Sequence, residues 1–158
     1  MNDETSERIW ETKQKLTLEY IEKYIKCDYE KIELLKTLKE QNFLLACASN
    51  CIKKTLYVIL DQLCLTEYFD LILSNEDVKF SKPSAEIYLK TMLELNCNPT
   101  DTLIIEDSQI GYEAASLTKA DVLRVINSKE VTYDRIKNSI FCNDRKIMKQ
   151  KYKNNKLS

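Results

Sequence analysis

The segment Leu103-Ile104-Ile105-Glu106-Asp107-Ser108-Gln109-Ile110-Gly111 is the most informative stretch of this sequence. An apolar run ends in two adjacent carboxylates, followed by a serine and, three residues later, by the only glycine of the 158 residues. In α/β proteins a buried parallel strand presents polar groups at its carboxyl end, where ligands bind. Paired carboxylates there suit Mg²⁺, a hard cation that prefers oxygen ligands. We therefore expect a metal-binding site at Glu106 and Asp107, with Gly111 allowing a close backbone approach or a sharp turn.

Composition and charge indicate one globular domain and argue against several functional classes. Apolar residues make up 44% of the chain and charged residues 31%, which is typical of folded rather than disordered proteins. The formal net charge of −1 provides no overall attraction to nucleic acid or to an anionic membrane. No apolar run approaches the roughly 18 residues that cross a bilayer, and the polar, acidic start does not resemble a secretory signal. We expect a cytoplasmic protein with no nucleic-acid or membrane partner.

The cysteines and the absence of histidine limit the possible chemistry. No two cysteines form a CxxC pair and the sequence contains no histidine, so a zinc site is not expected. Without histidine the commonest general base and the serine–histidine triads are excluded. Chemistry must depend on carboxylates, hydroxyls and lysine. We expect reduced thiols that pack as small apolar groups at all six cysteines: Cys27, Cys47, Cys51, Cys64, Cys97 and Cys142.

Helical hydrophobic spacing predicts helices, and short apolar runs between them predict strands. This alternation favours an α/β fold, a Rossmann-like parallel sheet of about four strands with flanking helices. The predicted strands are 43–48, 68–73, 103–105 and 122–126, and the predicted helices are 7–26, 29–40, 52–63, 84–95 and 111–118. The signal weakens from Asn127 onward. We divide the chain into a helical segment (1–40), an α/β core (41–140) and a basic tail (141–158), which we interpret as a solvated or frayed helix.

Polar residues follow three of the predicted strands or open the next helix. Ser49 and Asn50 follow the first strand, Lys82 precedes Pro83 at a helix start, and Glu106 and Asp107 end the most apolar strand. Singly, each has an ordinary structural explanation: a helix cap, a surface lysine, a turn. Together, a hydroxyl, an ammonium and paired acids at one edge of a sheet favour a site that holds a phosphate and its Mg²⁺.

These motifs resemble the haloacid dehalogenase-like (HAD) superfamily, in particular its phosphatase and β-phosphoglucomutase-like branch. The resemblance extends over about residues 34–125, and its motifs are Leu-Ala-Cys-Ala-Ser-Asn (45–50), Phe-Ser-Lys-Pro-Ser-Ala-Glu-Ile-Tyr (80–88) and Ile-Ile-Glu-Asp-Ser-Gln-Ile-Gly (104–111). It implies that Ser49 and Asn50 bind the phosphate of a small phosphorylated molecule. It further implies that Lys82 pairs with that phosphate, that Ser49 and Lys82 are catalytic, and that Glu106 and Asp107 hold Mg²⁺.

The sequence departs from the family pattern in two respects. The family's first motif, an Asp-x-Asp at the end of a central strand, supplies the attacking carboxylate, and no Asp-x-Asp occurs in these 158 residues. Loss of that strand would leave two buried edges with unpaired backbone groups, so we expect closure by direct pairing of the flanking strands, by a strand from another chain or by self-association. Two glycines usual in the family are also replaced, by Ser81 and by Lys119. Residues 1–40 resemble the remnant of a cap domain.

Three hypotheses follow from this departure. The first is a Mg²⁺-dependent phosphoester hydrolase or phosphotransferase core that is truncated and inactive alone, completed by a separate polypeptide. The second is a non-catalytic HAD-like protein that binds a phosphorylated ligand or a protein partner. The third is a degraded gene product or a start placed at an internal methionine.

Overall fold

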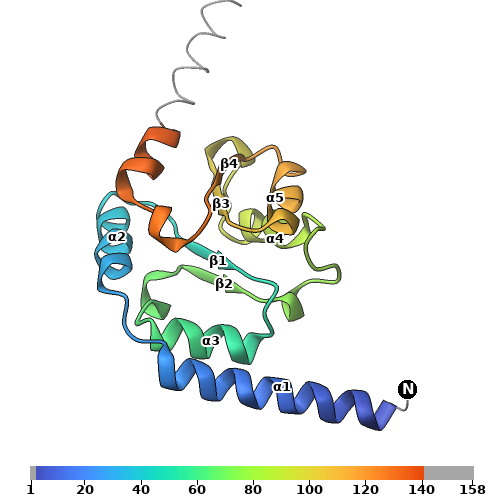
Figure 1. Cartoon of the computed structure of the whole chain (residues 1–158). Helices are drawn as coiled ribbons and strands as arrows, with labels where there is room; N and C mark the ends of the chain where they lie inside the picture. Colours follow the sequence, from blue (N-terminus) through green and yellow to red (C-terminus); the bar gives the residue numbers. More distant parts are fainter. Residues whose placement is uncertain (1–2, 141–158) are drawn as a thin grey trace, which may run out of the picture.

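The computed structural model describes residues 3–140 of the chain, with side chains from residue 8 onward (Figure 1). The predicted basic tail, 141–158, lies outside this range. Within it no helix is both long and apolar enough to cross a membrane. The labelled elements are α1 (Asp3–Tyr24), α2 (Tyr29–Glu40), β1 (Ala46–Ala48), α3 (Lys53–Gln62), β2 (Leu71–Leu73), α4 (Glu86–Glu94), β3 (Leu103–Glu106), α5 (Gln109–Ser116) and β4 (Asp121–Arg124).

The four strands form two separate parallel pairs. β1 pairs with β2, with Ala46 opposite Leu71, and β3 pairs with β4, with Leu103 opposite Asp121. The α/β class and the four parallel strands are confirmed. Within the described residues β1 and β3 do not pair with each other, because the structure contains two two-stranded sheets. Direct pairing of the flanking strands, one of the three expected ways to close the sheet, is therefore wrong.

Alternating side chains of the β1–β2 pair contribute to two apolar clusters. One cluster joins both sheets: it includes Leu73 of β2, Ile87 of α4 and Ile104 of β3, with Ala48 of β1 at its margin. The other joins α2 and α3 to the opposite face of the first sheet, where Cys47 and Ile72 lie. Residues adjacent in a strand thus face different clusters, as the two-residue period requires. Helix α4 packs against β1 and β2. Its buried residue Ile87 lies in the same apolar cluster as Ile104 of β3.

Several element boundaries differ from the prediction, and for the starts of β1 and α5 the structure shows a local cause. The first strand begins at Ala46 rather than residue 43, since the Leu45 amide donates to the Asp70 carboxylate (2.7 Å). Helix α5 begins at Gln109 rather than residue 111, because the Ser108 hydroxyl accepts a hydrogen bond from the Gly111 amide (3.1 Å) and caps the helix.

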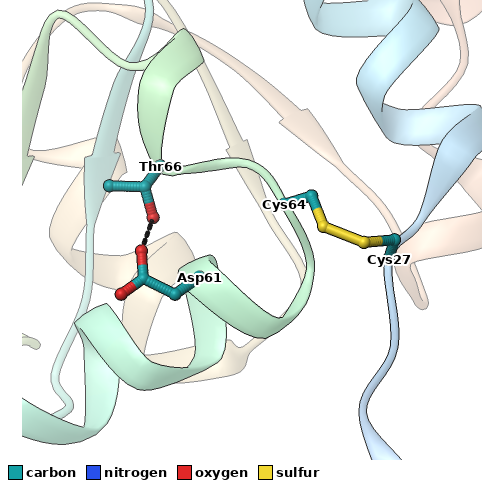
Figure 2. The surroundings of a disulfide bond; sticks show 4 residues. All are labelled: Cys27, Asp61, Cys64 and Thr66. Carbon is teal, nitrogen blue, oxygen red and sulfur yellow. Dashed lines mark hydrogen bonds between the residues drawn. A yellow bond between two sulfur atoms is a disulfide. The ribbon is translucent and has the colours of Figure 1, made fainter.

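A disulfide joins Cys27 to Cys64, so the expectation that all cysteines are reduced is wrong (Figure 2). Cys27 lies between α1 and α2, and Cys64 follows α3. The two are 37 residues apart in sequence, but the fold brings their Cα atoms to 5.1 Å, within the usual range for a disulfide. Figure 2 also shows Thr66 donating to the Asp61 carboxylate (2.5 Å) near the turn that carries Cys64. Sequence spacing alone could not reveal this pairing.

The region after Asn127, where the periodic signal weakened, contains a helix over residues 133–140. It lies beside α2 in Figure 1. The Lys31 ammonium donates to the carbonyl of Val131 (3.0 Å), and the side chain of Gln41 donates to the Tyr133 hydroxyl (2.8 Å). Ile136 is buried. The predicted division at residues 40 and 140 stays a prediction.

Four non-glycine residues adopt the left-handed backbone conformation, and each follows a helix. Asn42 (φ 62°), Cys64 (58°) and Asn96 (53°) lie two residues beyond the ends of α2, α3 and α4, and Lys119 (65°) lies beyond α5. This is where helices commonly end on glycine. The backbone geometry expected at the family glycine is thus present at Lys119, at the steric cost that a Cβ atom imposes there.

We predict that Lys119→Gly stabilises the protein. Glycine adopts positive φ without steric cost, a gain that exceeds its extra unfolded-state entropy and leaves about 0.5–1 kcal/mol of added unfolding free energy. Urea unfolding followed by circular dichroism measures the change. Lys119→Ala, which keeps the Cβ atom, is the matched control and is expected to have little effect; an equal gain in both variants would contradict the explanation.

Candidate functional site

The buried ammonium of Lys82 connects the carboxyl ends of the two sheets. Its Nζ lies 2.5 Å from Oε1 of Glu106, the last residue of β3, and 3.0 Å from the carbonyl oxygen of Ala48, the last residue of β1. The side chains of Lys82 and Glu106 are each only 8% exposed. Lys82 therefore spans the boundary at which β1 and β3 fail to pair, and it places a positive charge at the edge where α/β proteins bind ligands.

Two side chains hold the Lys82 segment from outside. The side-chain amide of Asn50 makes two hydrogen bonds to the Lys82 backbone. It accepts from the N–H (3.1 Å) and donates to the carbonyl (3.2 Å). The Glu86 carboxylate accepts from the amides of Lys79 and Phe80, both at 2.8 Å. Asn50, predicted to bind substrate, thus has a clear structural contact that positions the lysine.

Glu106 is enclosed by hydrogen-bond donors on both carboxylate oxygens. Oε1 accepts from Lys82 and from the Tyr88 hydroxyl, and Oε2 accepts from the Ser108 hydroxyl (3.1 Å). The Lys82 ammonium also lies over the Tyr88 ring, 4.6 Å from its centroid. Sequence reasoning missed both Tyr88 and Ser108. The Ser108 hydroxyl also caps α5, and an N-cap signal could have found it. Tyr88 is an apolar-face residue of α4 with no sequence signal for this role.

These contacts change the ionisation of both acidic partners. Burial alone would raise the pKa of Glu106, but the hydrogen bonds from Lys82, Tyr88 and Ser108 outweigh it, so the pKa lies below its ordinary value. Burial, together with the hydrogen bond to the Glu106 carboxylate, raises the pKa of Tyr88 well above its usual range. At neutral pH Glu106 is therefore a carboxylate and Tyr88 a neutral phenol.

The single glycine makes room for this carboxylate. A Cβ atom at Gly111 would overlap the carboxylate of Glu106. The φ angle of Gly111 is not positive, so the requirement is space rather than backbone conformation. The predicted close approach at Gly111 is confirmed, and its cause is the side chain of Glu106 against the first turn of α5.

The other two predicted residues lie at the same edge with different surroundings. Ser49 follows Ala48, and its hydroxyl accepts from the amide of Cys51 (3.1 Å). The ordinary explanation of Ser49 and Asn50, a helix cap, does not hold for α3, because Ile52 is its N-cap and makes no side-chain cap. A carboxylate from the neighbouring loop, Glu76, accepts from the first α3 amide (2.9 Å) instead. Asp107 is exposed.

The described residues do not by themselves make a complete cation site. Carboxylate oxygens are the right donors for Mg²⁺, but both oxygens of Glu106 already accept hydrogen bonds within the protein. Asp107 remains as an exposed carboxylate. No group of three or more metal-ligating side chains is present among residues 3–140. Any Mg²⁺ bound at this edge would need further oxygen ligands.

Comparison of sequences shows a match to one protein family. The family model described as haloacid dehalogenase-like hydrolase matches residues 2–125. A phosphorylated carbohydrates phosphatase from Thermotoga maritima is 36% identical over 83 residues, and a phosphoglycolate phosphatase from Aquifex aeolicus is 39% identical over 80 residues. These matches cover 52% and 51% of the chain, and 38% of each relative. The chain thus spans well under two thirds of these relatives.

Solved structures share the fold. A β-phosphoglucomutase from Clostridium difficile superposes with a TM-score of 0.76 over 94% of this chain and 71% of that one, at 21% identity. A putative β-phosphoglucomutase from Thermotoga maritima superposes with a TM-score of 0.60 over 71% of this chain and 52% of that one, at 28% identity. The arrangement of the two parallel pairs and their helices is therefore that of a known α/β architecture.

We predict that Glu106→Gln destabilises the protein in a pH-dependent way. The change leaves the Lys82 ammonium buried without its counter-charge, which costs about 3–5 kcal/mol at neutral pH. Because folding lowers the pKa of Glu106 from its ordinary 4.5, the carboxylate stabilises the fold fully above that value and loses its contribution as the pH falls through the lower folded value. Urea unfolding of both proteins from about pH 7 to about pH 3 should show the difference shrinking; a constant difference would contradict the assignment.

The Gly111 explanation predicts a strong coupling with Glu106. Gly111→Ala should cost at least about 2 kcal/mol of unfolding free energy, because the methyl group overlaps the carboxylate. In a Glu106→Ala background the same change should be neutral or stabilising, since the space is vacated and alanine is the better helix former. A double-mutant cycle measured by urea unfolding gives the coupling energy. Additive effects would show that some other contact excludes the methyl group.

Proposed function

Because the chain belongs to the haloacid dehalogenase-like hydrolase family, we propose that it forms the phosphate-binding part of a Mg²⁺-dependent phosphoester hydrolase or phosphotransferase. The observation that carries this proposal is the position of Lys82, whose ammonium contacts Ala48 and Glu106 at the carboxyl ends of two strands. An ammonium has three N–H donors. Two are used by these contacts, which leaves one for a phosphate oxygen at the sheet edge.

Ser49 supports the same assignment. Its hydroxyl oxygen accepts from the Cys51 amide, so the hydroxyl hydrogen is available to donate to a second phosphate oxygen. Ser49 directly follows Ala48, whose carbonyl binds the Lys82 ammonium. A phosphate above the carboxyl ends of β1 and β3 would therefore meet a hydroxyl on one side and an ammonium on the other. In this role Asn50 positions Lys82 rather than touching the substrate.

The separation of the two sheets supports the proposal that a strand is missing between β1 and β3. Within residues 3–140, β1 has only β2 as a partner and β3 has only β4, which leaves one edge of each without a strand. Each unsatisfied buried backbone group costs about 1–3 kcal/mol. We propose that an extended strand, not contained in these 158 residues, pairs in parallel with both edges. Its carboxyl end would then lie beside Lys82.

That strand would also supply the chemistry that the chain lacks. If it ends in Asp-x-Asp, as in the family pattern, the first carboxylate oxygen attacks phosphorus while the ester oxygen leaves and takes a proton from the second aspartic acid. Water then hydrolyses the aspartyl-phosphate to release inorganic phosphate. Asp107 and the added carboxylates would then be ligands of Mg²⁺. When bound, this cation would neutralise part of the phosphate charge. Without the added strand we expect no turnover.

The proposed substrate is a small phosphorylated metabolite. The two curated relatives carry the names of phosphatases that act on such molecules, phosphorylated carbohydrates and phosphoglycolate. These names are those of enzymes and do not favour the non-catalytic alternative. Which metabolite this chain acts on is left open by the proposal, and a cytoplasmic location stays a prediction.

A complementation experiment tests this proposal. The chain is mixed with a synthetic peptide, an apolar β-branched run that ends in Asp-x-Asp, and hydrolysis of para-nitrophenyl phosphate is measured with and without Mg²⁺. We expect peptide- and Mg²⁺-dependent release of nitrophenol, because the peptide supplies the nucleophile.

The controls separate binding from catalysis. A peptide ending in Asn-x-Asn should bind equally but give no hydrolysis, and Lys82→Met should abolish the activity while fluorescence anisotropy reports whether the labelled peptide still binds. Absence of both peptide binding and hydrolysis would overturn the proposal. Binding without hydrolysis would overturn its catalytic part.

A further inference from the structure

The disulfide between Cys27 and Cys64 fixes the connection between α1 and α2 to the turn after α3 (Figure 2). Cys27 lies three residues beyond the end of α1 and two before the start of α2, and Cys64 lies two residues beyond the end of α3. Next to this bond the amide of Asp28 donates to the carbonyl of Leu63 (3.2 Å). The disulfide is therefore placed at the point where α1 joins the rest of the fold.

Helix α1 contacts the protein through one narrow face. It packs against α3, and Figure 1 shows it along the outer side of that helix. Among its side chains from residue 8 onward, Ile21 is buried, three are partly buried (Gln14, Thr17 and Leu18) and all others are exposed. These four positions are three, one and three residues apart, so they share one face. Because local stability follows the buried contacts of a segment, α1 is a weakly held unit.

Helix α2, on the other side of the disulfide, has strong contacts of its own. Ile32 and Leu38 are buried, and the Lys39 ammonium pairs with the Asp70 carboxylate at 2.6 Å. These contacts anchor α2 to the apolar cluster of the first sheet and to the residue that precedes β2. Loss of the disulfide therefore leaves α2 in place, and α1 is the element whose attachment depends on the bond.

The disulfide is accessible, and the chain also holds free thiols. Cys27 and Cys64 are both partly exposed, as attack by an external thiol requires. Among the described residues three cysteines are unpaired: Cys47, Cys51 and Cys97. Chains of oxidising compartments pair their cysteines, whereas disulfides that form in reducing compartments are transient and take part in catalysis or redox sensing. One accessible disulfide beside three free thiols favours a bond that responds to redox conditions.

We propose that the disulfide between Cys27 and Cys64 is a redox-controlled latch, which holds α1 on α3 when oxidised and releases α1 when a dithiol reduces it. One thiolate of the dithiol attacks a sulfur of the disulfide, and the other cysteine leaves as a thiolate and takes up a proton. The second thiolate of the dithiol then displaces the remaining cysteine, which is protonated in turn. Two electrons pass to the chain, and the dithiol becomes a disulfide.

Release of α1 uncovers the side of α3 on which it lies. Thr55 of α3 is buried in the oxidised chain, and its hydroxyl donates to the side chain of Gln14 (3.1 Å). After reduction the junction of α1 with the fold is held by the hydrogen bond between Asp28 and Leu63 and by the packing of α2. The narrow face of α1 is then the remaining contact of that helix with α3. This latch is independent of the proposed phosphoryl chemistry.

Hydrogen–deuterium exchange of the full chain, followed by mass spectrometry, tests the proposal. After reduction with dithiothreitol, amides of α1 should exchange at least about tenfold faster, because the helix opens more often. Amides of α2 and α5 should keep their rates, since their packing does not involve the bond. Reoxidation with glutathione disulfide should restore slow exchange in α1. The intact mass verifies the redox state of each sample.

Two cysteine variants separate the latch from other effects of the reductant. Cys27→Ser should show fast exchange in α1 with and without dithiothreitol. Cys97→Ser, the same change at an unpaired cysteine, is the matched control and should keep the wild-type response. Circular dichroism verifies that both variants fold. Equal exchange of α1 in both redox states overturns the proposal. So does an equal acceleration in every element, because the bond would then stabilise the whole fold, and so does a disulfide that dithiothreitol leaves intact in the folded chain.

Discussion

The ion pair between Lys82 and Glu106 is the contact on which the rest of this structure depends. Both side chains are almost fully buried, and buried charges are tolerated only when every polar atom finds a partner. The pair meets this condition through Ala48, Tyr88 and Ser108. The carboxylate in turn excludes any side chain from position 111. One electrostatic contact thus accounts for the single glycine, the start of α5 and the junction of two sheets.

Much of this arrangement was predictable from local sequence. Short apolar runs identified four strands and helical spacing identified the helices between them, and their alternation indicated a parallel α/β fold, as observed. The polar residues at the strand ends were predictable for the same reason, because parallel strands carry their carboxyl ends to one edge. The structure brings Asn50, Lys82 and Glu106 into contact there. The roles of these residues, and of Ser49 and Asp107, in binding phosphate and metal stay predictions.

The features that sequence reasoning missed are long-range or depend on side-chain choice. The contact from Tyr88 to Glu106 and the cap that Glu76 provides to α3 each join segments that only the tertiary fold brings together. The disulfide joins cysteines 37 residues apart. The left-handed backbone at Lys119 was missed for a different reason. A glycine signals this conformation in a sequence, and this chain has a lysine at that position. In each case the local pattern is silent and tertiary contacts decide the outcome.

The unpaired edges of β1 and β3 restrict what can pack against them. The free edges of β1 and β3 carry backbone donors and acceptors in fixed register, so only an extended strand of matching direction can satisfy both. A strand in the gap would complete a sheet and place new groups beside Lys82.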